Sequence, residues 1–110
     1  MAALALTVQN CALTGLEPVY VPANAEGNYF ANDGKTLLHV VNAGVADITV
    51  TIDSPVLCNQ GFAHDEAVVV PAGKERMIGP FTPSRFNANG VVNVSYSDVT
   101  DVTAAAIKVE

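Results

Sequence analysis

Short runs of β-branched and other apolar residues recur along the chain, and no stretch between them has the length and spacing of a helix. Runs of this kind, spaced by roughly eight to twelve residues, are typical of an all-β sandwich or barrel. We therefore predict one antiparallel β-sandwich over residues 1–110, Ig-like or jelly-roll-like, with roughly seven to eight strands. The predicted strands cover residues 4–8, 19–21, 36–41, 48–52, 67–70, 75–78, 91–96 and 105–109.

The clearest alternation lies in the middle of the chain. Ile48, Val50 and Ile52 alternate with polar residues, which predicts a half-buried strand with one wet face. Residues 36–42 and 46–53 are joined by a four-residue link that contains a glycine, so we predict that they form a β-hairpin. The predicted core includes Leu38, Val40, Ile48, Val50, Ile52, Val92, Val94 and Ile107.

Turn signals separate the strands. Glycine accepts positive φ without steric cost and therefore marks the tightest turns. The longest irregular stretch is Pro22–Gly34, in which Tyr29 and Phe30 are the only bulky side chains, and we expect them to pin this loop onto the sandwich. The strongest predicted turns are Asp33-Gly34, Pro71-Ala72-Gly73-Lys74 of type II, and Asn89-Gly90.

Composition limits the partners. Half of the 110 residues are hydrophobic and 15% are charged, which fits a single compact domain. The net charge is −6, and the 5 basic residues are scattered among 11 acids, so we expect neither nucleic acid nor an anionic membrane as partner. No apolar run approaches the ~20 residues of a spanning helix. The apolar start lacks a basic n-region, which predicts synthesis in a cytoplasm without a signal peptide.

Candidate chemistry is sparse. The cluster His64-Asp65-Glu66 is the densest polar group, but two His and two Cys in the whole chain favour a solvated loop over a zinc site. His39 lies inside a predicted strand and is expected to be a cross-strand neighbour rather than a base. Asp98 and Asp101 lack the oxygen-rich loop of a calcium site. We predict no catalytic residue, no cofactor and no metal.

Cys11 and Cys58 allow two interpretations. Two small buried hydrophobes is the favoured one. A disulfide is the alternative, and in the chain-entropy model a loop of this length would stabilise the fold by roughly 4 kcal/mol. A cytoplasmic origin argues against the disulfide.

Several stretches carry a family resemblance: Asn32-Asp33-Gly34-Lys35-Thr36-Leu37-Leu38-His39-Val40, Pro71-Ala72-Gly73-Lys74-Glu75-Arg76-Met77-Ile78-Gly79-Pro80-Phe81, Arg85-Phe86-Asn87 and Val92-Asn93-Val94-Ser95-Tyr96-Ser97. Over about Leu6 to Val109 the chain resembles small β-sandwich proteins encoded among the head genes of tailed bacteriophages and prophages. The resemblance carries no catalytic motif.

This resemblance implies a virion structural protein, synthesised in the host cytoplasm. The first expectation is a capsid decoration (cement) protein that binds the major capsid protein in many copies and forms a homo-oligomer. A tail or neck component comes second. Another adhesion-type interaction module and a carbohydrate-binding module remain as alternatives, although the latter needs exposed aromatic platforms and the chain has no Trp.

The N-terminal stretch Ala2 to Val8 is the leading docking candidate. Its alternating Leu4, Leu6 and Val8 could add as a strand to the sheet edge of another copy or of the capsid subunit. Alternatively, the segment is the first strand of the chain's own sheet. The full set of predicted interface residues is Leu4, Leu6, Val8, Tyr29, Phe30 and Phe62.

Overall fold

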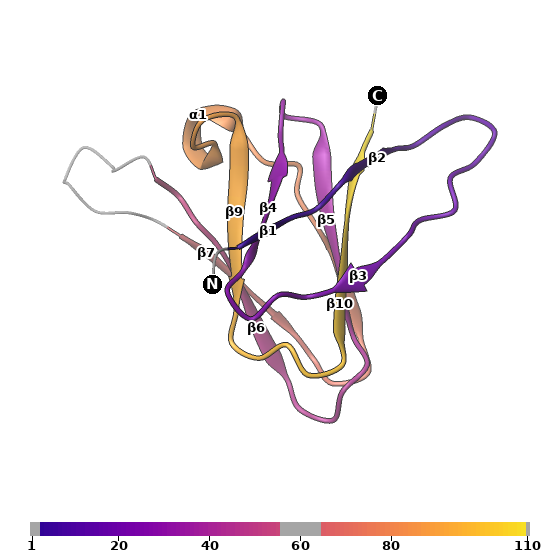
Figure 1. The fold of residues 1–110 in the computed structure, drawn as a ribbon, viewed down its shortest axis with the longest axis vertical. Coiled ribbons are helices and arrows are strands. Elements are labelled where there is room, and N and C mark those ends of the chain that lie inside the picture. Colours follow the sequence, from indigo (N-terminus) through magenta and orange to yellow (C-terminus); the bar gives the residue numbers. More distant parts are fainter. Residues whose placement is uncertain (1–2, 56–64, 110) are drawn as a thin grey trace.

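The molecule consists of two five-stranded sheets packed face to face (Figure 1). The computed structural model describes residues 3–55 and 65–109. The first sheet has the order β1 (Leu4–Ala5), β4 (Asn28–Ala31), β9 (Val91–Tyr96), β6 (Ile48–Ile52) and β7 (Glu66–Val70). The second has the order β2 (Val8–Asn10), β10 (Val102–Lys108), β5 (Thr36–Asn42) and β8 (Glu75–Ile78), and β3 (Val21–Pro22) also pairs with β10.

The predicted all-β sandwich is confirmed, with two differences in detail. The described residues form ten strands instead of seven to eight, because the N-terminal part contributes strands of only two to four residues. Such strands are too short for a period of two to show. The sheets are also mixed instead of antiparallel, because β1 runs parallel to β4 and β2 runs parallel to β10. The described residues form one helix, α1 (Pro83–Phe86), which has four residues. It is too short to span a bilayer.

The predicted hairpin over residues 36–53 is wrong. β5 pairs with β10 and β8, whereas β6 pairs with β9 and β7 in the opposite sheet. The link between them is a corner that crosses the sandwich, and Asn42, only 1% exposed, holds it. Its amide nitrogen donates to the carbonyls of Ala46 (2.9 Å) and Val70 (3.0 Å), and its Oδ1 accepts from the Gly44 N–H (3.0 Å). These bonds satisfy backbone groups that a crossing would otherwise leave unpaired.

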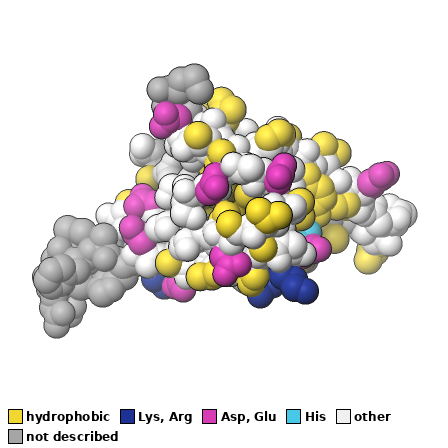
Figure 2. Space-filling model, turned by 90° about the horizontal axis from the view of Figure 1, so that it is seen from below, with side chains coloured by type: hydrophobic (Ala, Val, Ile, Leu, Met, Phe, Trp, Pro, Cys, Tyr) yellow, Lys and Arg dark blue, Asp and Glu magenta, His cyan; other side chains and the backbone are white. Residues whose placement is uncertain are grey.

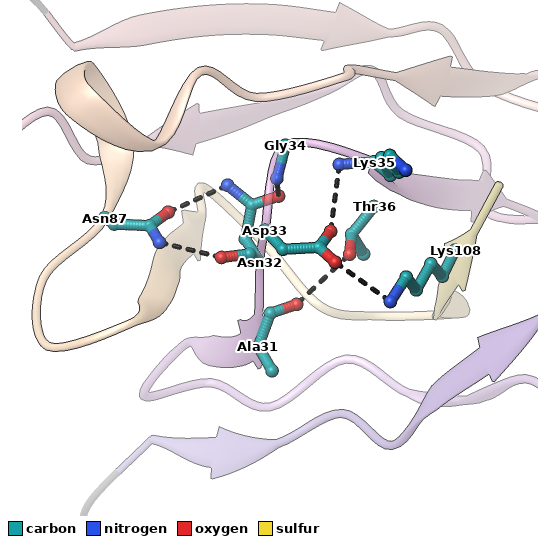
Figure 3. A network of polar contacts seen from close by, with 8 residues as sticks. All are labelled: Ala31, Asn32, Asp33, Gly34, Lys35, Thr36, Asn87 and Lys108. Atoms are coloured by element: carbon teal, nitrogen blue, oxygen red, sulfur yellow. Dashed lines mark hydrogen bonds and ion pairs between the residues drawn. The ribbon is translucent and has the colours of Figure 1, made fainter. Parts of the chain in front are cut away.

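A second buried asparagine holds the crossing from β4 to β5, shown in Figure 3. The Oδ1 of Asn32 accepts from the Gly34 N–H (3.0 Å), and its amide nitrogen donates to Oδ1 of Asn87 (2.8 Å). The amide nitrogen of Asn87 donates back to the Asn32 backbone carbonyl (2.8 Å). Asp33 at the same turn lies 2.9 Å from Nζ of Lys108 at the end of β10. The hydrogen bond from Lys108 holds the pKa of Asp33 below its ordinary value. Both crossings therefore use the pattern Asn-X-Gly.

The predicted turns are confirmed by their backbone geometry. The Lys74 N–H donates to the Pro71 carbonyl at 3.0 Å, and Gly73 has φ of +72°, as a type II turn requires. Asn89 and Gly90 have φ of +54° and +84°, which are the two positive angles of a type I′ turn.

The core lies between the sheets, and every predicted core residue is buried. Ile107, however, belongs to the opposite face of β10 from the core cluster. On this strand Val102, Ala104 and Ala106 point inward instead. The core also has an aromatic part, in which the ring centroids of Phe81 and Phe30, and of Phe81 and Phe86, lie 5.6 Å apart.

Candidate interaction surface

The N-terminal segment belongs to the chain's own sheets. β1 lies against β4, β2 lies against β10, and the segment crosses between the two sheets at the edge of the sandwich. At the crossing Leu6 is buried (5% exposed) and its N–H donates to the Tyr29 carbonyl at 2.7 Å. Val8 is half-buried against the core, so of the three alternating residues only Leu4, 58% exposed, presents most of its side chain to solvent.

The other predicted interface residues are placed differently from expectation. Residues 22–34 do not form an irregular loop, because they contain β4, and Tyr29 and Phe30 are part of that strand. Phe30 points into the core and is 1% exposed, so it is unavailable to a partner. Tyr29, on the other face of β4, is half-buried. Phe62 and Cys58 lie outside the described residues, so the alternative of a Cys11–Cys58 disulfide stays a prediction. Cys11 itself is exposed, which contradicts the favoured prediction that it is buried.

Residues 11–20 form a loop that leaves the body of the sandwich between β2 and β3 (Figure 1). We call it the projecting loop. Its base is closed by Gln9, whose Nε2 donates to the Val19 carbonyl (2.7 Å) and whose Oε1 accepts from the Val19 N–H (2.8 Å). Near its tip the Gly15 N–H donates to the Ala12 carbonyl (2.9 Å), and Gly15 has φ of +98°. Leu13, inside this turn, is fully exposed.

A hydrogen-bonded chain of three side chains anchors the C-terminal end of the projecting loop. The Tyr20 hydroxyl lies 2.6 Å from Nδ1 of His39, and Nε2 of His39 lies 2.6 Å from Oε1 of Glu75. The rings of Tyr20 and His39 also meet edge to face at 5.2 Å. A carboxylate only accepts, so Nε2 donates to Glu75 and, in the neutral ring, Nδ1 accepts from Tyr20.

The chemistry of these three side chains suits an anchor better than a nucleophile. Burial raises the pKa of Tyr20, and the negative charge of Glu75 raises it further, so the phenol stays protonated. His39 is paired across the sheet with Met77 on one side and Ala105 on the other, as expected of a cross-strand neighbour. The three residues come from β5, β8 and the projecting loop, so their hydrogen bonds tie the loop to the outer face of the second sheet.

An apolar groove of about 310 Å³ lies beside the base of the projecting loop. We call it the alanine groove. One wall is the N-terminal segment, the other is the strand entering β3, and the floor is β10. Only Thr7 and Gln9 contribute polar side chains, and the Gln9 amide is already bonded to Val19. The lining residues are Ala5, Leu6, Thr7, Gln9, Val19, Val21, Ala104, Ala105 and Ala106.

Exposed apolar side chains gather on this side of the molecule. Among the described residues eight large hydrophobic side chains are exposed, and four of them, Leu4, Leu13, Val19 and Val21, come from the first 21 residues. Figure 2 looks at the end of the sandwich that lies at the bottom of Figure 1, where hydrophobic atoms lie among acidic ones over the middle and right of the view. An apolar cluster on an otherwise acidic surface marks a candidate docking surface.

Several of the acidic residues that the structure describes are engaged in turns and hydrogen bonds. Within residues 3–55 and 65–109 no group of three or more His, Cys, Asp or Glu is placed to hold a metal ion. Burial raises the pKa of Asp53, and the charge and hydrogen bond of neighbouring Asp65 raise it further. Asp65 also accepts from the Ser54 N–H (2.8 Å). Asp98 caps a turn, because its Oδ1 accepts hydrogen bonds from the N–H and the hydroxyl of Thr100 (3.1 Å each). These bonds hold the pKa of Asp98 below its ordinary value.

The described aromatic side chains are all partly or fully buried, so this part of the chain has no flat exposed ring on which a sugar could stack. Tyr96 is largely enclosed: its hydroxyl donates to Oδ1 of the buried Asn28 (2.7 Å), and burial raises its pKa. Comparisons with protein-family models, curated proteins and solved structures find no match to the chain.

Proposed function

We propose that the protein is a non-catalytic binding module and that it docks through the side of the sandwich formed by β1, β2, β3 and the projecting loop. The observation that carries this proposal is the grouping of Leu4, Leu13, Val19 and Val21 on that side. Each fully buried apolar side chain of this size contributes roughly 1.5–3 kcal/mol, so a partner that covers them gains several such terms.

The way the projecting loop is held supports the proposal. Gln9 closes its base, a turn ends at Gly15, and Tyr20 anchors it to His39. A loop that is already ordered loses little conformational entropy when a partner binds, so more of the contact energy appears as affinity.

We further propose that the binding partner is a bacteriophage capsid and that the protein decorates its outer surface. The residues of the family resemblance support this, and so does the small size of the chain, 11.4 kDa. Many copies on one shell give avidity, so each contact need only be modest. A protein that binds the closed shell and not its open form stabilises the closed shell by mass action.

Co-sedimentation with purified capsids of the encoding phage or prophage tests this proposal. We expect saturable binding by the wild-type protein. Leu4, the predicted interface residue that stays exposed, provides the matched variant: Leu4→Asp should weaken capsid binding by about tenfold or more. Val45→Asp changes a fully exposed valine on the corner between β5 and β6 and should leave binding unchanged. Absence of wild-type protein from the capsid pellet would refute the capsid assignment.

A further inference from the structure

The alanine groove is built for an apolar side chain and not for a polar ligand. Its lining has no charged residue, and the amide of Gln9 has both of its polar ends engaged with Val19. Small-molecule sites depend on a few well-placed polar groups to orient the ligand. Here such groups are nearly missing from the lining, and the alanines leave room above the floor of β10. A branched aliphatic side chain matches this chemistry.

The chain itself presents such a side chain a short distance away. Leu13 is fully exposed in the turn of the projecting loop. Gln9 and Val19 both close the base of this loop and line the groove, so the groove lies at the base and Leu13 near the tip. Because its side chain is fully exposed, Leu13 does not occupy the groove of its own chain.

We propose that two copies of this chain form a two-fold dimer in which the Leu13 side chain of each copy fills the alanine groove of the other. If two projecting loops of equal length lie antiparallel, each tip reaches the base of the other loop. One two-fold axis then makes both contacts at once, which is the self-complementary arrangement of an isologous dimer. The inference rests on the proposed function in taking this side of the sandwich as a docking surface. It assigns Leu13, Val19 and Val21 to the contact with the second copy and leaves Leu4, which does not line the groove, for the capsid.

The distribution of charge favours a second copy as the occupant. Each chain carries a net charge of −6, so two copies repel each other over most of their surface. The first 25 residues contain a single charged residue, Glu17, out of 11 acids and 5 bases. Two copies therefore approach with the least repulsion when they meet through the projecting loop and the groove.

Sedimentation equilibrium of the purified protein, without capsids, tests the dimer. The wild type should have twice the 11.4 kDa mass of one chain. Leu13→Asp replaces the apolar side chain near the loop tip by a charged one, and Ala5→Glu places a charge at an exposed position of the groove wall. Each variant should weaken dimerisation by about a hundredfold or more, because both copies lose their contact. Val45→Asp, at an equally exposed valine outside this surface, should dimerise as the wild type does.

Mixing the two defective variants gives the decisive measurement. The Leu13→Asp protein keeps its groove and the Ala5→Glu protein keeps its tip, so the mixture should form a heterodimer through one of the two contacts. A monomeric wild type, a dimer that survives Leu13→Asp, equal loss with Val45→Asp, or no association in the mixture would each overturn the proposal. An unchanged strand-type far-UV spectrum shows that the variants fold. Since capsids are absent, this result and the capsid result can fail independently.

Discussion

Replacing Asn42 by alanine tests how the two sheets are joined. The substitution leaves three backbone groups without their partner: the carbonyls of Val70 and Ala46 and the N–H of Gly44. The bond to Val70 is fully buried, and losing it costs about 1–3 kcal/mol because water does not replace it easily. The other two bonds are partly buried, so each is worth about 0.5–1.5 kcal/mol. We expect Asn42→Ala to lower the free energy of unfolding by about 2–6 kcal/mol.

Urea unfolding followed by far-UV circular dichroism measures this loss, with an unchanged m-value as the check for two-state behaviour. Asn10→Ala, at an exposed position of β2, is the control and should stay within about 0.5 kcal/mol of the wild type. A loss below about 1 kcal/mol for Asn42→Ala would refute the corner as a source of stability.

Replacing Asn42 by aspartate should make the free energy of unfolding depend on pH. In Asn42→Asp a carboxylate oxygen replaces the amide nitrogen that faces the carbonyls of Ala46 and Val70. This raises the pKa of the new carboxyl group in the folded state above the unfolded value of about 3.9. Because a raised acid pKa favours the protonated fold, the variant should be most stable below that unfolded pKa and lose stability as pH rises toward the folded pKa. Stability that increases with pH relative to the wild type would contradict this assignment.

Three further predictions follow from the packing and the ion pairs. Val50→Ala, at a fully buried position, should lower the free energy of unfolding by roughly 1–3 kcal/mol, and an unchanged melting temperature would show that β6 faces the other way. Tyr20→Phe removes the hydroxyl bonded to His39 and should cost about 0.5–1.5 kcal/mol while speeding proteolysis within residues 11–20; equal cleavage rates would exclude the anchor. Lys108 lowers the pKa of Asp33, so this pair stabilises the fold at neutral pH, and its contribution disappears as pH falls below about 4. Asp33→Asn should therefore reduce the loss of unfolding free energy on acidification, and a loss identical to that of the wild type would refute the role of the pair.

The alternation of apolar and polar residues was sufficient to predict the central strands. Ile48, Val50 and Ile52 face the core as expected because a half-buried strand has a strict period of two. β10 is buried on both faces, so its pattern carries no sign of which residues point inward, and Ile107 was therefore assigned to the wrong face. The hydrophobic pattern therefore predicts which residues are buried, but it shows which side chains point into the core only in strands that have one solvent-exposed face.

The connections were harder to predict than the strands. A short link with a glycine turns the chain equally well within one sheet or across to the other, and local turn residues do not distinguish these paths. The signal that was missed is the asparagine two residues before each glycine, Asn32 and Asn42, since both are buried in the structure. A buried asparagine needs partners, and the corner supplies them.

The candidate surface depends on long-range contacts that no local pattern shows. Tyr20, His39 and Glu75 are separated by 19 and 36 positions, and only the pairing of β5 with β8 brings the last two together. The alanine groove likewise combines the start of the chain with Ala104–Ala106. In the sequence these alanines suggest only a small-residue strand, because the space above them exists only after the sheets have formed.

The position of β10 determines when the protein can fold during synthesis. β2 and β3 pair with no other strand among the described residues, and β10 also separates them from β5. The residues of β2 leave the ribosome first, yet their sheet has no place for them until Val102–Lys108 have been made. β1 can pair with β4 earlier, but β2 and β3 stay unpaired until then and are open to chaperones and to other nascent chains. β5 and β8 can pair without β10, but the second sheet is complete only after Val102–Lys108 have been made. A chain truncated before β10 leaves β2 and β3 without a strand to join.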